Sequence, residues 1–210
     1  MKKILIYGDS NVWGDNFFTG VRIPDERQWP NILQQLLGNK FKVLQEGLPG
    51  RVAGNIEVDK KYKNGKNAFL TVLKTNAPVD YVIIALGTND LQVKYNRKAT
   101  LIVRDLLWYK DIILEEYNDD DNKKKYFVNG KMPKIIYLLP THFIERENNS
   151  IFNYNSEDKR KQLIELFKKN QNVISYVFDR LPLFEDGVHL NYDGHKQLAE
   201  EVKKIIIEGE

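Results

Sequence analysis

The stretch KILIYGDS, residues 3–10, contains the pattern that decides the fold. Residues 4–7 are apolar, which is typical of a short buried strand, and Gly8-Asp9-Ser10 end that strand with residues that favour turns. Residues 41–44, 81–86, 134–139 and 173–178 have the same character, so we predict four further strands. The segment 81–86 is the most apolar of these, which favours a central position in a parallel sheet covered on both faces.

Segments with helical spacing of apolar residues separate the predicted strands. They are residues 28–37, 67–74, 97–117, a segment around 163–167, and 192–207. Ser156 is the predicted N-cap of the fourth of these helices. In the last one we expect a buried stripe made by Leu198, Val202, Ile205 and Ile206. The charged run 118–125 is predicted to be a solvated loop without chemistry.

The alternation of strands and helices predicts an α/β fold with a five-stranded parallel sheet between two helical layers, a three-layer α/β/α architecture. The chain has no internal repeat and no linker-like stretch, so we expect residues 1–210 to form a single domain. Parallel sheets of this kind bind ligands beyond the carboxyl ends of their strands. The loops after the strands, and the loop before the last helix, should therefore meet at one edge.

Composition excludes several classes of function. The 32 basic and 29 acidic residues are nearly balanced and spread along the chain, which disfavours nucleic acid as a partner. The chain has no cysteine, and this excludes disulfides, thiolate metal sites and a cysteine nucleophile. The apolar start is too short for a secretory signal, and no apolar run reaches the length of a membrane span. We expect a cytoplasmic protein without a membrane partner.

Four of the loops at the expected edge contain clusters of polar residues and glycine. They are GDSN at 8–11, GR at 50–51, GTND at 87–90 and DGVH at 186–189. A serine hydroxyl becomes a nucleophile when a base accepts its proton, and neutral histidine suits that task near pH 7. The histidine in turn needs a carboxylate that fixes its tautomer. These requirements point to Ser10 as nucleophile, His189 as base and Asp186 as its partner.

The base follows by elimination, because the chain has three histidines and His189 alone has an aspartate three residues before it. His195 lies within the last predicted helix and is expected to serve packing. His142 follows a predicted strand, where it could line the pocket or lie on the surface. A developing oxyanion needs preorganised donors, for which we consider the N–H groups of Ser10 and Gly50 and the side-chain amide of Asn89. Glycine at position 50 would also let a substrate carbonyl approach the backbone closely.

These four blocks, in this order and spacing, closely resemble those of the GDSL/SGNH serine hydrolases, and the resemblance spans nearly the whole chain. It implies a flavodoxin-like sheet and ester or thioester hydrolysis through an acyl-enzyme on Ser10, without metal or other cofactor. The stretches 45–51 and 82–90 look most like the bacterial arylesterase and acyltransferase branch. That likeness implies Gly50, rather than Gly47, as the oxyanion donor. Members of the branch often form oligomers, so a homo-oligomer stays open.

The substrate stays open at this stage. The first hypothesis is a small carboxylic ester, acetyl or aryl, with carbohydrate deacetylation or acyl transfer included. The second is a lysophospholipase or thioesterase for long chains, for which the polar 148–158 region supplies no obvious apolar groove. The third is a non-enzymatic nucleotide-binding module, but the loop after the first strand lacks the glycine-lysine of a phosphate loop.

Several other residues near the predicted site have two interpretations or an expected structural role. Trp13, Phe17 and Phe18 could form an acyl or aryl pocket wall or pack in the core. Arg51 could meet an anionic substrate group. Asp9 and Asp90 are expected to be structural and to hydrogen-bond the backbones of the loops that contain Ser10 and Asn89.

Overall fold

A computed structural model describes residues 1–144 and 151–209 of the chain. Its centre is a five-stranded sheet with the order β2-β1-β3-β4-β5, in which every neighbouring pair is parallel. The strands are β1 (Lys2–Gly8), β2 (Phe41–Gly47), β3 (Tyr81–Ala85), β4 (Lys134–Leu138) and β5 (Ile174–Tyr176). The predicted fold class is confirmed, and β3 occupies the central place that its apolar sequence indicates. This strand order is that of flavodoxin-like sheets.

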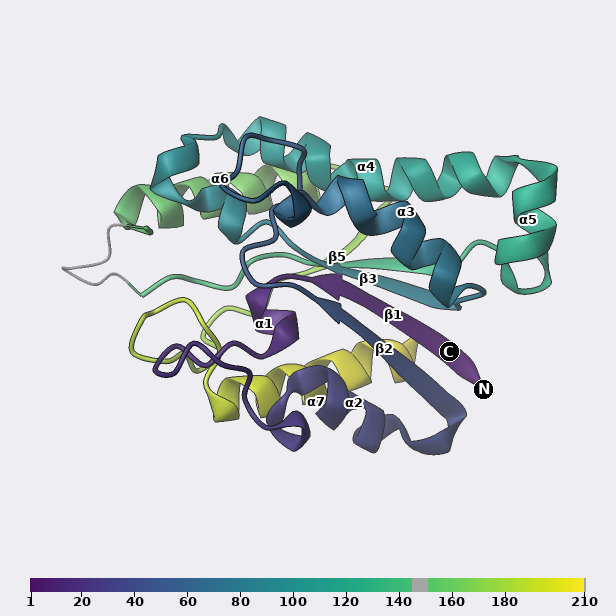
Figure 1. Ribbon diagram of the computed structural model, residues 1–210, viewed down its shortest axis with the longest axis horizontal. Coiled ribbons are helices and arrows are strands. Elements are labelled where there is room, and N and C mark those ends of the chain that lie inside the picture. The colour runs from purple at the N-terminus through teal and green to yellow at the C-terminus, as the bar shows by residue number, and fades with distance from the viewer. Residues whose placement is uncertain (145–150, 210) are drawn as a thin grey trace.

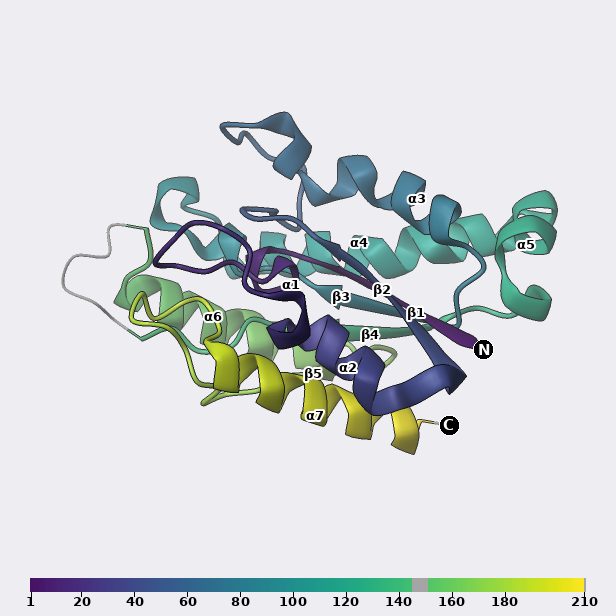
Figure 2. The same cartoon turned by 60° about the horizontal axis from the view of Figure 1, so that its bottom comes forward.

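Helices cover both faces of the sheet (Figure 1). They are α1 (Ser10–Trp13), α2 (Trp29–Leu37), α3 (Gly65–Asn76), α4 (Ala99–Asn118), α5 (Asp120–Tyr126), α6 (Tyr154–Lys168) and α7 (Tyr192–Glu208). Short 3-10 turns lie at Asp25–Arg27, Gly38–Lys40, Lys61–Lys63, Asn89–Leu91, Val93–Tyr95 and Val128–Gly130. Helices α3, α4 and α6 lie on one side of the sheet, and α2 and α7 lie on the other (Figure 1). Helices α2 and α7 pack against each other (Figure 2). Within the described residues, no helix is both long enough and apolar enough to span a bilayer.

Two hydrophobic cores result from the alternation of side chains along the strands. In β1, Leu5 and Tyr7 point into the core beneath α3, α4 and α6. Ile4 and Ile6 point the other way, into the core formed with α2 and α7. All four are fully buried, which is why this segment is apolar without a break. The predicted stripe of α7 is also confirmed, since its four residues are buried in the second core.

The charged run 118–125 is helical over most of its length, which corrects the loop predicted there. Asp119 caps α5 by accepting a hydrogen bond from the backbone N–H of Asn122 at 2.8 Å. Two aspartates lie in the first turn of α5 and three lysines in its last, the arrangement that a helix dipole favours. The charges that suggested a solvated loop therefore also stabilise a short exposed helix.

The N-cap of α6 is Asn153, three residues before the predicted Ser156. The Asn153 side chain accepts from the Ser156 N–H, and the Ser156 hydroxyl accepts in return from the Asn153 N–H, which forms a capping box. The hydroxyl of Ser156 also donates to the carbonyl of Leu91 at 2.9 Å. Ser156 is thus buried and joins α6 to the turn after β3. Of the polar 148–158 region, residues 148–150 lie outside the described residues.

Glycines at the ends of β1 and β2 bring α1 against the sheet. Gly8 and Gly47 are partners in the parallel register. A Cβ on Gly47 would overlap the backbone nitrogen of Trp13 and lie 2.7 Å from its Cα. A Cβ on Gly8 would lie 2.8 Å from the carbonyl oxygen of Ala85 in β3. Where the chain turns from β1 into α1, the backbone of α1 therefore lies directly against the backbone at the end of β2.

This contact predicts a large effect of Gly47→Ala on folding. The added methyl has no flexible side chain to displace, so we expect a loss of about 3 kcal/mol in the free energy of unfolding, at the upper end of overpacking effects. Gly20→Ala is the control, because Gly20 has a φ of 65° but open space around its Cβ position. It should lose only about 1–2 kcal/mol. Chemical denaturation measures both, and equal losses in the two variants would contradict the contact.

Candidate active site

Ser10 is the first residue of α1, on the short turn that follows β1. Asp9 caps this helix by accepting a hydrogen bond from the Asn11 N–H at 3.0 Å. Gly14 ends it with a φ of 86°, in the left-handed region that suits glycine. Ser10 is 5 % exposed, so its side chain meets solvent over a small area. The turn thus presents one hydroxyl at the carboxyl edge of the sheet.

The loop before α7 folds around the carboxylate of Asp186. Its Oδ1 accepts hydrogen bonds from the backbone N–H groups of Val188 and His189, both at 3.1 Å. Its Oδ2 is hydrogen-bonded to Nδ1 of His189. The carbonyl of His189 accepts from the N–H of Phe184 at 2.7 Å. One carboxylate therefore fixes both the loop backbone and the orientation of the imidazole.

Nε2 of His189 lies 3.0 Å from Oγ of Ser10. The structure therefore joins the three predicted residues in one hydrogen-bonded chain from Asp186 through His189 to Ser10, although Ser10 and His189 are 179 positions apart. The side chain of His189 is 22 % exposed and that of Asp186 is 10 % exposed. The imidazole is thus partly exposed, which suits proton transfer to and from a bound substrate.

Asn89 lies in the loop after β3 with its amide orientation fixed by neighbours. Its Oδ1 accepts from Nε2 of Gln92 at 2.8 Å, and its Nδ2 donates to the carbonyl of Arg51 at 3.2 Å. A carboxamide nitrogen has two hydrogens, so one donor remains for another acceptor. Gly50 lies in the turn before Arg51 with a φ of 76°. Gly47, by contrast, ends β2 and is covered by α1.

A buried ion cluster supports the loops that contain Asn89 and Gly50. Asp90 accepts from the Ala53 N–H at 2.7 Å and pairs with Arg97, which also pairs with Asp105. Lys66 completes the cluster 2.7 Å from Asp105. Asp90 itself has no exposed surface. Asp90 therefore holds the loop after β2 to the loop after β3. This structural role is wider than the expected bond within one loop.

Arg51 is part of the frame of the site, and this corrects the idea that it meets an anionic substrate. Its side chain is buried and its guanidinium lies 4.0 Å from the centre of the Tyr7 ring. One guanidinium nitrogen donates to the carbonyls of Gly8, at 2.8 Å, and Glu46. Arg51 therefore binds the carboxyl ends of β1 and β2 together, immediately before the turn with Ser10.

The other two histidines lie apart from the hydrogen-bonded chain. His195 is fully buried in α7, where its Nδ1 accepts from the N–H of Trp29 at 3.2 Å, so its expected packing role is confirmed. His142 is half-buried, and its Nδ1 accepts from the N–H of Arg180 at 3.3 Å. The structure thus gives His142 a contact with the loop after β5.

The aromatic residues after α1 lie at the surface. Phe17 and Phe18 are 46 % and 60 % exposed, so the core-packing interpretation is wrong for both. The Phe18 ring lies edge-on against Phe184, with 5.6 Å between ring centres, and Phe184 in turn contacts Tyr192. Trp13 is half-buried, with Arg22 over its ring. The 15–22 loop therefore packs on the loop that contains Asp186 and His189.

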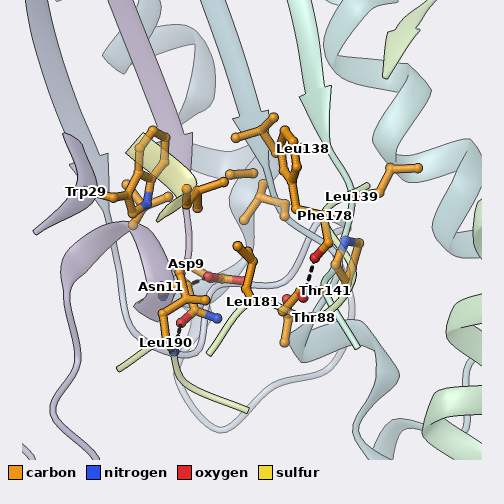
Figure 3. Close-up of a pocket in the computed structure, with 15 residues that line it drawn as sticks. Asp9, Asn11, Trp29, Thr88, Leu138, Leu139, Thr141, Phe178, Leu181 and Leu190 are labelled. Carbon is orange, nitrogen blue, oxygen red and sulfur yellow. Dashed lines mark hydrogen bonds between the residues drawn. The ribbon is translucent and has the colours of Figure 1, made fainter. Parts of the chain in front are cut away.

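A small cavity of about 50 Å³ lies behind the turn with Ser10 (Figure 3). Its lining includes the polar residues Asp9, Asn11 and Thr88, and is otherwise mostly apolar, with Trp29 and Phe178 among the larger side chains. Figure 3 shows Asn11 between Asp9 and Leu190, with a hydrogen bond to each. In the part of the chain that the structure describes, no three histidine, aspartate or glutamate side chains are grouped so that they could hold a metal ion.

Residues 4–202 match the family model of GDSL-like lipases and acylhydrolases. The chain belongs to this family. Comparison with curated proteins found no match. Among solved structures, a putative arylesterase from Agrobacterium tumefaciens is 26 % identical with a TM-score of 0.84, and 99 % of each chain is covered.

Two further solved structures have the same fold. A carbohydrate acetylesterase family member from Sinorhizobium meliloti is 25 % identical, with a TM-score of 0.81 over 98 % of this chain and 97 % of the other. The aryl esterase of M. smegmatis is 22 % identical, with a TM-score of 0.84 and 99 % of each chain covered. This last likeness shows the fold alone. Over nearly its whole length, the chain therefore shares the fold of these solved structures.

The electrostatics separate the acidic groups of this GDSL-like site. Burial alone would lower the pKa of His189, but the hydrogen bond and charge of Asp186 more than offset it, so that the pKa lies above its usual 6.5. Burial would raise the pKa of Asp186, but the bonds from His189 and from two backbone N–H groups hold it below 3.8. Burial raises the pKa of Asp9 to about 6, against the opposing effect of its bond from Asn11. Asp186 is therefore the carboxylate that stays charged.

These shifts predict distinct NMR titrations for the histidines. His189 should titrate above pH 6.5, whereas burial should lower the pKa of His195 to about 3 and keep it neutral throughout the working range. Asp186→Asn should lower the pKa of His189, because the hydrogen bond and the charge of Asp186 are the largest effects that raise it. His142→Gln and His195→Gln assign the signals. A His189 pKa that Asp186→Asn leaves unchanged would contradict this account of the pair.

Proposed function

We propose that the chain hydrolyses carboxylic esters of small acids through an acyl-enzyme formed on Ser10. The single observation that carries this proposal is the continuous hydrogen-bonded chain from Asp186 through His189 to Ser10. Membership of the GDSL-like lipase and acylhydrolase family, together with esterases as structural neighbours, supports the reaction class.

Ser10, His189 and Asp186 each have a role in the proposed reaction. Oγ of Ser10 attacks the ester carbonyl while Nε2 of His189 accepts its proton, and the charge of Asp186 stabilises the imidazolium. The tetrahedral intermediate collapses when His189 returns that proton to the leaving alcohol. Water then attacks the acyl-enzyme, again with His189 as base, and releases the carboxylic acid and free Ser10. An alcohol in place of water gives acyl transfer.

The oxyanion of each tetrahedral intermediate would be held by three donors. These are the backbone N–H groups of Ser10 and Gly50 and the second Nδ2 hydrogen of Asn89. The bonds of Asn89 to Gln92 and Arg51 support this role, because they fix the amide before substrate binds. Donors that need no reorganisation at the moment of reaction are the most effective ones.

Hydrolysis of p-nitrophenyl acetate tests the assignment. Ser10→Ala should lower kcat by about 10⁶-fold, since loss of the nucleophile removes the acyl-enzyme route. Asn89→Ala should lower kcat by about 10²–10³-fold with a smaller effect on KM, since its donor acts on the oxyanion. Ser175→Ala, in β5, is the matched control and should retain full activity. Turnover by Ser10→Ala at the wild-type rate would remove Ser10 as the nucleophile.

The surface beside His189 favours esters with a ring in the alcohol part. The backbone N–H of Phe184 donates to the carbonyl of His189. The ring of Phe184 contacts that of Phe18, which in turn contacts the ring of Phe17. Two of these three rings are exposed and offer flat apolar faces. The solved neighbours include a carbohydrate acetylesterase family member and a putative arylesterase. We therefore favour acetyl esters of aryl alcohols or of carbohydrates.

A series of p-nitrophenyl esters with increasing acyl length separates this function from lysophospholipase or thioesterase activity. The proposed substrates are acetyl esters, whose acyl part is short. We therefore expect kcat/KM to be highest for acetyl or butanoyl esters and to fall at longer acyl lengths. Values measured below each ester's solubility limit are needed for a fair comparison. A steady rise toward palmitoyl esters would favour the long-chain alternative instead.

A further inference from the structure

Asn11 connects the helix that contains Ser10 with the loop that contains His189. Its Oδ1 accepts from the N–H of Leu190 at 2.8 Å, and its Nδ2 donates to the carbonyl of Val188 at 3.3 Å. These two backbone groups belong to the residues on either side of His189. One side-chain amide therefore bonds the backbone on both sides of His189, with its oxygen as acceptor and its nitrogen as donor. Neighbouring strands in a sheet pair in the same way.

This arrangement also fixes Asn11 itself. Its own backbone N–H is held by the carboxylate of Asp9, and it lies in α1 directly after Ser10. The Asp9 carboxylate is 2 % exposed, so the anchor is removed from water. The position of the His189 backbone is thus set relative to the Ser10 backbone through one short rigid side chain. This side chain directly connects two segments that are 179 positions apart in the sequence.

The opposite side of the loop has its own restraints. The carbonyl of His189 accepts from Phe184, and Leu183 forms an antiparallel bridge with Leu190. These contacts keep the loop folded on itself, but they do not connect it to α1. The family is named for a G-D-S-L block, whereas this chain has G-D-S-N at residues 8–11. A leucine at position 11 has neither the donor nor the acceptor that the loop uses here.

We propose that Asn11 is a positioning residue for the proposed ester hydrolysis, which acts by holding His189 at proton-transfer distance from Ser10. The inference rests on the proposed function and extends it to a side chain that does not touch the substrate. Displacement of a catalytic group by about 1 Å can cost about 10²-fold in rate. Loss of both bonds of Asn11 removes the direct connection between α1 and the backbone beside His189, and this allows a displacement of that kind.

The test compares Asn11→Leu and Asn11→Asp with wild type. For each we measure kcat and KM with p-nitrophenyl acetate, the rate of labelling by a serine-directed fluorophosphonate, and the thermal midpoint of unfolding. Asn11→Leu should lower kcat and the labelling rate together by about 10²-fold while KM stays within about 2-fold. Asn11→Asp keeps the acceptor for Leu190 and loses the donor for Val188, so it should lower both rates by about 10-fold.

Asn31→Leu is the matched control. Asn31 also donates from Nδ2 to a loop carbonyl, that of Asp25, at 2.9 Å, but it lies in α2 away from the site. It should retain wild-type kcat and labelling. A folded Asn11→Leu with wild-type kcat, or with a raised KM and an unchanged labelling rate, would overturn the positioning role. If Asn11→Leu does not fold, wild-type labelling of folded Asn11→Asp overturns it equally.

The wild-type protein separates this inference from the proposed function. Wild type that turns over the ester while Asn11→Leu matches it would refute the positioning role alone. Wild type that neither hydrolyses the ester nor reacts with the fluorophosphonate would refute ester hydrolysis itself, and the positioning role with it.

Discussion

The turn that presents Ser10 rests on contact between backbones at the carboxyl ends of β1 and β2. Gly8 and Gly47 lie opposite each other in the register, and α1 occupies the space where a side chain on Gly47 would stand. Arg51 also connects the ends of these two strands, because its guanidinium donates to the carbonyls of Gly8 and Glu46. These contacts fix the backbone of α1, and hence that of Ser10, against the sheet. Parallel register then places the loops after β2 and β3 at the same edge, where Gly50 and Asn89 lie.

The site has two halves that are stabilised differently. The half with Gly50 and Asn89 is held by a buried ion cluster, because Asp90 and Arg97 connect the second and third loops beneath the surface. Such clusters are costly to desolvate, so their value lies in fixing geometry more than in stability. The half with Asp186 and His189 lies on a loop, which depends on backbone hydrogen bonds and on Asn11. The alignment of the proton-transfer half therefore depends on hydrogen bonds to the loop backbone, whereas the other half depends on buried charges.

The sequence was sufficient for the fold and for the convergence of Ser10, His189 and Asp186, because strand periodicity and the position of loops in parallel sheets are local and general properties. It was insufficient where one residue type serves two purposes. The aspartates and lysines of α5 suit a loop as well as a helix terminus, and Ser156 suits position N3 of a capping box as well as an N-cap. A contact of Arg51 with an anionic substrate stayed open in the sequence, because nothing local shows that its guanidinium folds back onto Tyr7. The sequence shows Asn11 in the first polar cluster but not its role, since its partners lie 177 and 179 positions away.

The pKa values of three aspartates near the site depend on their surroundings. Asp186 accepts from two backbone N–H groups and from His189, and these bonds keep its pKa below 3.8. Asp9 is buried with fewer donors, and its pKa rises to about 6, as does that of Asp90 despite its pairing with Arg97. A charged Asp9 and a charged Asp186 both favour the imidazolium form of His189. As pH falls through about 6, Asp9 becomes neutral and its contribution is lost, whereas that of Asp186 persists. The orientation of His189 therefore stays under the control of Asp186 across the pH range in which the imidazole itself titrates.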